Sequence, residues 1–126
     1  MNEYKPLFDA IEDLKERARE GWVIIVEGVR DAESLRNLGV RGEIIVFSGF
    51  AATADIVKDR DSIIMTDYDS RGMEIERGLI RALQSYGKVP DTGIKRRIFS
   101  NVKKEISKVE ELHSFISKIR VSKNSK

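Results

Sequence analysis

The chain has 126 residues, of which 35% are charged, and 23 Lys and Arg against 21 Asp and Glu give it a formal net charge of +2 at pH 7. This length suits a single domain, residues 1–126, with one core. The absence of cysteine and the single histidine, His113, exclude disulfides, thiolate zinc sites and histidine-cluster metal sites. No apolar run approaches the roughly 20 residues that cross a bilayer, and no signal-peptide core is evident, so we expect a cytoplasmic protein with no membrane partner.

The charges are divided along the chain. Residues 1–94 carry 13 basic and 18 acidic side chains, whereas residues 95–126 carry 10 basic and 3 acidic ones. An acidic body with a basic end is typical of a cation site beside a contact with a phosphate backbone. A basic tail that is merely solvated is the alternative interpretation.

The predicted elements alternate between helices and strands. Apolar residues at helical spacing, with Pro6 in the first turn and Gly21 after the end, predict a helix over about residues 6–19. Short apolar runs predict strands at 22–26, 43–47, 62–66 and 94–99. Helical patterns predict helices at about 31–38, 51–58, 72–86 and 108–120.

The fourth predicted strand, residues 94–99, has Ile94 and Ile98 on one face and Lys95 and Arg97 on the other. Arg96 interrupts this alternation, which favours a strand at the edge of the sheet. Strand and helix alternation predicts an α/β fold with a four-stranded parallel sheet, helices on both faces and an extra helix at each terminus.

Two acidic residues, Asp67 and Asp69, directly follow the third predicted strand. If the chain stays extended there, both side chains point the same way. Carboxylates so placed repel each other unless a cation lies between them, and hard oxygen ligands suit Mg²⁺. A helix cap or a turn is the alternative interpretation of the pair.

The first predicted strand also ends in an acid and a glycine, Glu27 and Gly28. Ligands of open α/β sheets bind beyond the carboxyl ends of the strands. If Glu27 shares a cation with Asp67 and Asp69, the first and third strands must be neighbours, which favours strand order 2-1-3-4. Gly49 and Gly72 are expected to allow tight turns near this edge, and Gly49 is also a candidate for close approach of a phosphate.

The string Val26-Glu27-Gly28, followed some forty residues later by Asp67-Tyr-Asp-Ser-Arg-Gly72, resembles the two signature motifs of the Toprim domain. The longer string Val-Glu-Gly-Val-Arg-Asp at 26–31 is most similar to small stand-alone Toprim proteins and to the ribonuclease that matures 5S ribosomal RNA; bacterial-type primases share the domain. The resemblance covers about residues 20–100. It implies a three-layer, Rossmann-like fold that binds Mg²⁺, with Mn²⁺ as a substitute.

The resemblance also implies roles for particular residues. Asp67 and Asp69 would hold the metal, and Glu27 would complete its shell or act as a general acid or base. Asp31 would help to hold a metal, although its position also suits a helix N-cap. The candidates for phosphate contacts are Arg30, Arg71, Lys95, Arg96 and Arg97.

Two functions remain open from the sequence. The first is Mg²⁺-dependent cleavage of a phosphodiester, or phosphoryl transfer, on RNA or DNA. The second is a module that binds Mg²⁺ and nucleic acid without cleavage, as a subunit of a larger complex. Topoisomerase and complete primase activities are not expected, because Tyr68, between two candidate metal ligands, is badly placed as a nucleophile, and the chain has no room for a primase's further domains.

Overall fold

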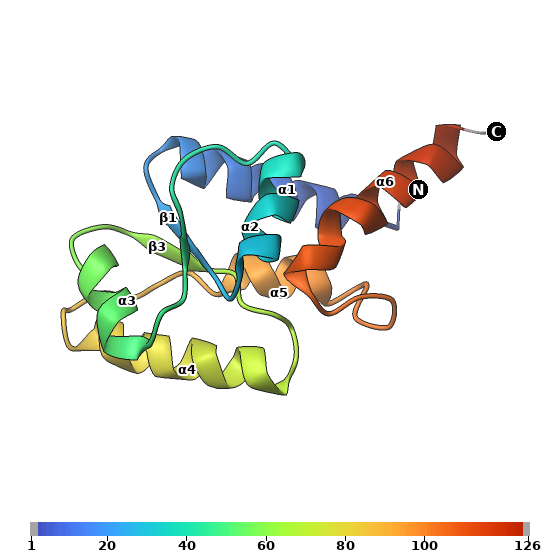
Figure 1. Ribbon diagram of the computed structural model, residues 1–126. Helices are drawn as coiled ribbons and strands as arrows, with labels where there is room; N and C mark the ends of the chain where they lie inside the picture. Colours follow the sequence, from blue (N-terminus) through green and yellow to red (C-terminus); the bar gives the residue numbers. More distant parts are fainter. Residues whose placement is uncertain (1–2, 125–126) are drawn as a thin grey trace.

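Three parallel strands form an open sheet in the order β2-β1-β3. The computed structural model describes the backbone of residues 3–124 and the side chains of residues 3–121. The strands are β1 (Val23–Val26), β2 (Ile44–Val46) and β3 (Ser62–Ile64). All four residues of the central strand β1 are buried, as expected for an apolar strand covered on both faces. Helices lie on both sides of this sheet (Figure 1).

The helices divide into two layers. One layer packs on the sheet face of Ile24 and Met65, and the other packs on the face of Ile25 and Ile64. The first layer contains α1 (Lys5–Arg19), α2 (Val29–Asn37), α5 (Gly93–Phe99), the short 3₁₀ helix η1 (Val109–Glu111) and α6 (Leu112–Asn124). The second contains α3 (Phe50–Val57) and α4 (Ser70–Gln84). The connection through α2 runs from β1 to β2, whereas the connections through α3 and α4 run across the sheet in the opposite direction. Because such crossovers are right-handed, the two groups of helices lie on opposite faces of the sheet.

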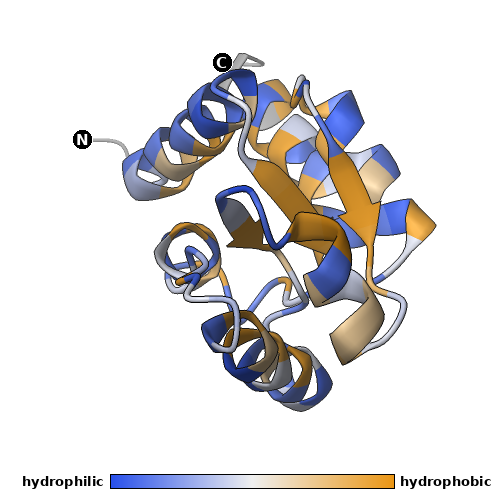
Figure 2. Ribbon diagram, turned by 90° about the vertical axis from the view of Figure 1, so that its left-hand side faces the viewer, coloured by the Kyte–Doolittle hydropathy of each residue, from blue (hydrophilic) through white to orange (hydrophobic). Residues whose placement is uncertain are grey.

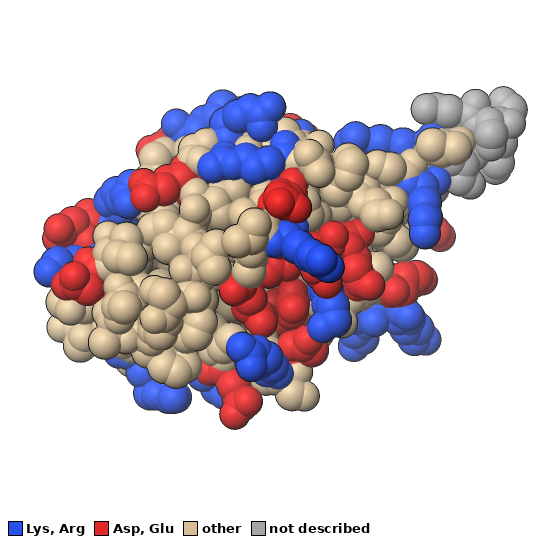
Figure 3. Space-filling view, in the orientation of Figure 1, with Lys and Arg blue, Asp and Glu red and all other residues tan. Residues whose placement is uncertain are grey.

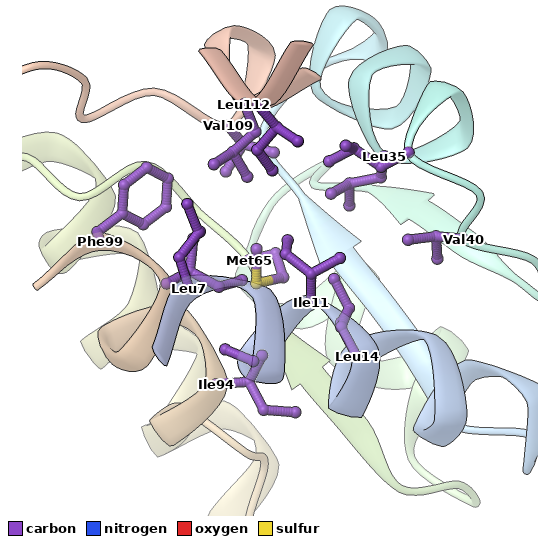
Figure 4. Close-up of a cluster of buried hydrophobic side chains, with 14 of the residues drawn as sticks. Leu7, Ile11, Leu14, Leu35, Val40, Met65, Ile94, Phe99, Val109 and Leu112 are labelled. Atoms are coloured by element: carbon purple, nitrogen blue, oxygen red, sulfur yellow. The ribbon is translucent and has the colours of Figure 1, made fainter. Parts of the chain in front are cut away.

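The larger of the two cores lies under α1. Leu7, Ile11 and Leu14 of that helix meet Met65 and side chains from α5 and η1 (Figure 4). The apolar strands lie between helices whose outward surfaces are hydrophilic (Figure 2). The apolar residues whose helical spacing predicted α1 form its buried face, and the opposite face carries charged side chains.

The order of the first three strands is confirmed, but the predicted fourth strand is wrong. Residues 94–99 form the helix α5. The outer edge of β3 is instead joined by a single parallel bridge between Ile63 and Asp91. In this bridge, the Ile64 N–H donates to the Asp91 carbonyl and the Asp91 N–H donates to the Ser62 carbonyl, each at 2.9 Å.

The helical periodicity explains the difference at residues 94–99. Ile94 and Ile98 are four residues apart and share the buried face of α5, together with Lys95, whereas Arg96 and Arg97 are both exposed. The arginine that interrupted the strand alternation fits a helical face without conflict. Among the described residues, no helix is long and apolar enough to cross a membrane.

Candidate metal and nucleic-acid site

The carboxyl ends of β1 and β3 are joined by a side chain. The backbone N–H of Asp67 donates to Oε2 of Glu27 at 2.7 Å. This bond is a consequence of the parallel pairing of β1 with β3, since both strands end at the same edge of the sheet. The structure therefore brings Glu27 and Asp67, which are 40 positions apart in sequence, into contact.

Asp69 is the N-cap of α4. Its backbone is extended, with φ −140° and ψ −179°, and its Oδ1 accepts a hydrogen bond from the Gly72 N–H at 2.8 Å. The second oxygen, Oδ2, lies 3.6 Å from Nζ of Lys108. Asp69 therefore caps the helix with Oδ1, while its Oδ2 faces the ammonium group of Lys108.

Asp31 does not occupy the N-cap position proposed for it. The helix α2 begins earlier, at Val29, with Gly28 as its N-cap, so Asp31 lies in the first turn. There its Oδ2 accepts a hydrogen bond from the Gly28 N–H at 2.9 Å. Because an acid at the third helical position can satisfy the N-cap N–H, the backbone turn after Glu27 is held by Asp31, which is only 6% exposed.

Gly72 serves close packing rather than a sharp turn. It lies inside the first turn of α4, and a Cβ there would come 1.9 Å from the carbonyl oxygen of Asp67. The Gly72 carbonyl in turn accepts a hydrogen bond from Thr66 Oγ1 at 2.8 Å. Glycine at this position allows α4 to begin directly against the backbone that carries Asp67. Gly49, by contrast, has φ +110° immediately before α3, as expected of a turn glycine.

Burial and mutual repulsion act on the carboxyl groups. Burial, with the nearby charges of Glu27, Asp31 and Asp69, raises the pKa of Asp67 to about 6, against the opposing hydrogen bond from the Val109 N–H. The pKa of Asp31 is also raised, chiefly by burial. The same acids favour a nearby cation: the charges of Asp67 and Asp69 raise the pKa of Lys108.

The donor chemistry fits a hard divalent cation. Glu27, Asp67 and Asp69 each use one oxygen to accept a backbone N–H. The second oxygens of Glu27 and Asp69 each lie 3.6 Å from an exposed cationic side chain, that of Arg71 and that of Lys108 respectively. Carboxylate oxygens are the ligands that Mg²⁺ prefers, and a divalent cation would replace these exposed ion pairs. In their present positions the described acidic side chains do not form a ready-made group of three around one point. A bound ion would therefore need rotation of these side chains and several water ligands.

The candidate phosphate contacts differ in exposure. Arg71 is 78% exposed, with Nε 3.6 Å from Glu27 Oε1, and Arg30 and Arg96 are exposed. Arg97 is also exposed but forms an ion pair with Asp13 at 2.7 Å. Lys95 is 1% exposed, so its assignment as a surface contact to nucleic acid was wrong. The error follows from the strand prediction, which placed Lys95 on an outward face.

Lys95 instead belongs to a buried polar network below Asp67. Its Nζ donates to Thr66 Oγ1 at 2.9 Å and lies 2.6 Å from Glu76 Oε1, an ion pair whose angles fall outside those of a hydrogen bond. The Thr66 hydroxyl in turn donates a hydrogen bond to the Gly72 carbonyl. Sequence reasoning missed the pair, although Glu76 falls on the apolar face of α4 between Ile75 and Leu79, which was a usable signal.

A short segment after α5 was also missed. Ser107, Lys108 and Val109 lie against Asp67, Tyr68 and Asp69, which are about forty positions earlier in the sequence. No local pattern reveals a contact over this separation.

On the surface, acidic side chains gather between the strand ends and the C-terminal region, with basic side chains at their border (Figure 3).

The fold and these motifs define a Toprim domain. The chain belongs to the Toprim family, whose match covers residues 22–102. It is 61% identical to the UPF0292 protein of Archaeoglobus fulgidus over 119 residues, 94% of this chain and 96% of the relative. It is 43% identical to the UPF0292 protein of Pyrococcus horikoshii, over 89% of this chain and 86% of the relative. A solved structure, a putative protein from Aquifex aeolicus, is similar with a TM-score of 0.69 and 29% identity, over 83% of this chain and 96% of that one.

Proposed function

We propose that this protein processes nucleic acid at the acidic edge of its sheet, cleaving a phosphodiester with the aid of Mg²⁺ or Mn²⁺. The observation that carries the proposal is the hydrogen bond from the Asp67 N–H to Glu27 Oε2. It brings acids from two strands together at the edge where ligands of such sheets bind. Family membership supports the same role, because the Toprim match includes both strands.

Asp67 and Asp69 would hold the ion through the oxygens that face away from the backbone, with Asp31 supporting the turn beside them. A divalent cation held there would supply polarisation of a phosphate and would offset the negative charge on its oxygens. Glu27 Oε1 would accept the proton of a water as the water oxygen bonds to phosphorus and the leaving oxygen departs. Arg71 and Arg30 would pair with phosphate oxygens at the same edge.

The test is incubation of labelled structured RNA and DNA with the protein, in Mg²⁺ and in EDTA. We expect cleavage in Mg²⁺ only, and its loss in Glu27→Gln, because glutamine can still accept the Asp67 N–H but cannot take a proton. Glu43→Gln is the matched control, since Glu43 forms an exposed ion pair with Arg60 on the surface. Cleavage that survives in Glu27→Gln would contradict the proposed role.

A second candidate function is binding without cleavage. It is favoured by one observation, that both oxygens of Glu27 already face donors, the Asp67 N–H and Arg71 Nε. In that case metal-dependent binding of RNA or DNA would occur with no product in the cleavage assay, and the protein would serve as a subunit of a larger complex. Binding that persists unchanged in EDTA would contradict this second candidate, because its binding depends on the metal.

A further inference from the structure

The segment 107–109 contacts three successive residues of the acidic motif. The Tyr68 N–H donates to the Ser107 carbonyl at 2.7 Å, and the Val109 N–H donates to Asp67 Oδ1 at 2.9 Å. Between these two backbone bonds, Lys108 extends its side chain to 3.6 Å from Asp69 Oδ2. The segment lies beyond residues 22–102, where the Toprim match ends.

The two backbone bonds fix the position of Lys108 but leave its ammonium group movable. Its side chain is 49% exposed, and its partner carboxylate is 33% exposed. An ion pair this exposed is weak and exchanges readily with water and other ions. Lys108 is therefore a cation that is tethered beside Asp67 and Asp69 and is free to leave them.

We propose that Lys108 is the counter-ion of Asp67 and Asp69 in the metal-free protein and a phosphate ligand in the loaded one. This inference rests on the proposed function, since it assumes that these carboxylates bind a divalent cation. An ammonium and a divalent cation compete for the same carboxylates, so metal binding displaces the lysine. Once displaced, the ammonium remains tethered at the edge of the site, where a phosphate drawn to the metal is its nearest new anion.

The first measurement is Mn²⁺ affinity, followed by paramagnetic broadening of amide signals around Asp67. We expect Lys108→Gln to bind Mn²⁺ about three- to tenfold more tightly than the wild type, because a competing positive charge is removed. Lys108→Arg should retain the wild-type affinity. The matched control is Lys58→Gln, since Lys58, the C-cap residue of α3 in the other layer, forms an exposed ion pair with Asp55 at 2.9 Å.

The second measurement is binding of a labelled RNA hairpin and a DNA duplex in Mg²⁺. We expect Lys108→Gln to weaken binding several-fold, whereas Lys58→Gln changes it little. An unchanged Mn²⁺ affinity, or unchanged nucleic-acid binding, in Lys108→Gln would overturn the inference while leaving the proposed function intact. If the wild type itself shows no Mn²⁺ broadening near Asp67, the proposed function fails and the inference with it.

Discussion

Burial and neighbouring acids act together on the carboxyl group of Asp67, whose pKa rises from 3.8 to about 6. A carboxyl group with a raised pKa in the folded state binds a proton more tightly there than in the unfolded chain. Its favourable contribution to stability is therefore fully present below about pH 4 and is lost as the pH rises through about 6. At neutral pH the ionised Asp67 opposes folding unless a cation is bound.

Asp67→Asn should consequently raise the free energy of unfolding at pH 7, because asparagine can still accept the Val109 N–H but carries no charge. The difference from the wild type should shrink toward zero near pH 4. Urea unfolding in EDTA, at both pH values, measures it. Asp59→Asn, at an exposed position, is the control and should show no such pH dependence.

A core substitution supplies the contrasting result. Ile64 is fully buried in β3, and Ile64→Ala should cost about 2–5 kcal/mol at both pH values through reduced burial and a cavity. If Asp67→Asn destabilises the protein by a comparable amount at pH 7, Asp67 is chiefly structural and the metal proposal loses its support.

The Lys95–Glu76 pair gives a second prediction for single residues, because both side chains are almost fully buried, with 2% and 6% exposed. Lys95→Met leaves the Glu76 carboxylate buried without its partner and should cost about 3–5 kcal/mol. The double change Lys95→Met with Glu76→Leu should recover much of that stability, since no uncompensated charge remains. Urea denaturation measures the free energy of unfolding of both variants. A double variant less stable than the single variant Lys95→Met would contradict the prediction.

At the scale of elements, the start of α4 depends on Gly72. Gly72→Ala places a Cβ 1.9 Å from the Asp67 carbonyl oxygen, and neither the helix nor the strand end can move without disturbing its packing. We expect destabilisation of more than about 2 kcal/mol. Gly93→Ala is the matched control, because it lies in the first turn of α5 with no atom within 4 Å of the added methyl group.

Gly93→Ala should be neutral or stabilising by up to about 1 kcal/mol, since alanine restricts the unfolded chain more than glycine does. Thermal unfolding of the two variants separates these effects. Equal melting temperatures for Gly72→Ala and Gly93→Ala would mean that α4 can shift away from Asp67 at little cost.

The sequence predicted the elements whose periodicity is long and clear. The order β2-β1-β3 followed from the acids at the strand ends, and α1 and α4 followed from their apolar stripes. Residues 94–99 were too short to distinguish a strand from a helix, because Ile94 and Ile98 lie on one face in either conformation.

The candidate site was predictable only where its residues follow a strand. Acids at strand ends are a local pattern, which singled out Glu27, Asp67 and Asp69, and the structure brings Glu27 and Asp67 into contact. The contacts of Lys108 and Val109 depend on how a later segment returns to the sheet edge, which no local pattern encodes. The burial of Lys95 was hidden by the same error that assigned α5 to a strand.

At the scale of the whole molecule, the basic C-terminal end predicts salt-dependent binding. Arg96 and Lys104 are exposed, and reversing both to Glu should weaken binding of RNA and DNA of any sequence. The slope of log affinity against log salt should flatten by about one for each phosphate that the variant no longer neutralises. Arg77→Glu with Arg81→Glu, on α4 of the opposite layer, is the control. Equal weakening by the two pairs would indicate a general effect of net charge.

The attachment of residues 107–109 to the acidic motif also bears on how the chain folds. The layer around α1 is assembled from both ends of the chain, since Ile11 and Leu112 share one core, and Ser34 accepts a hydrogen bond from the His113 N–H, 79 positions later. Contacts between such distant segments are slow to form, so we expect folding to be slower than the helical content alone indicates. During synthesis the acids at positions 67 and 69 leave the ribosome well before Lys108 and Val109. Until Lys108 and Val109 emerge, Asp67 lacks the hydrogen bond that the Val109 N–H donates to its side chain.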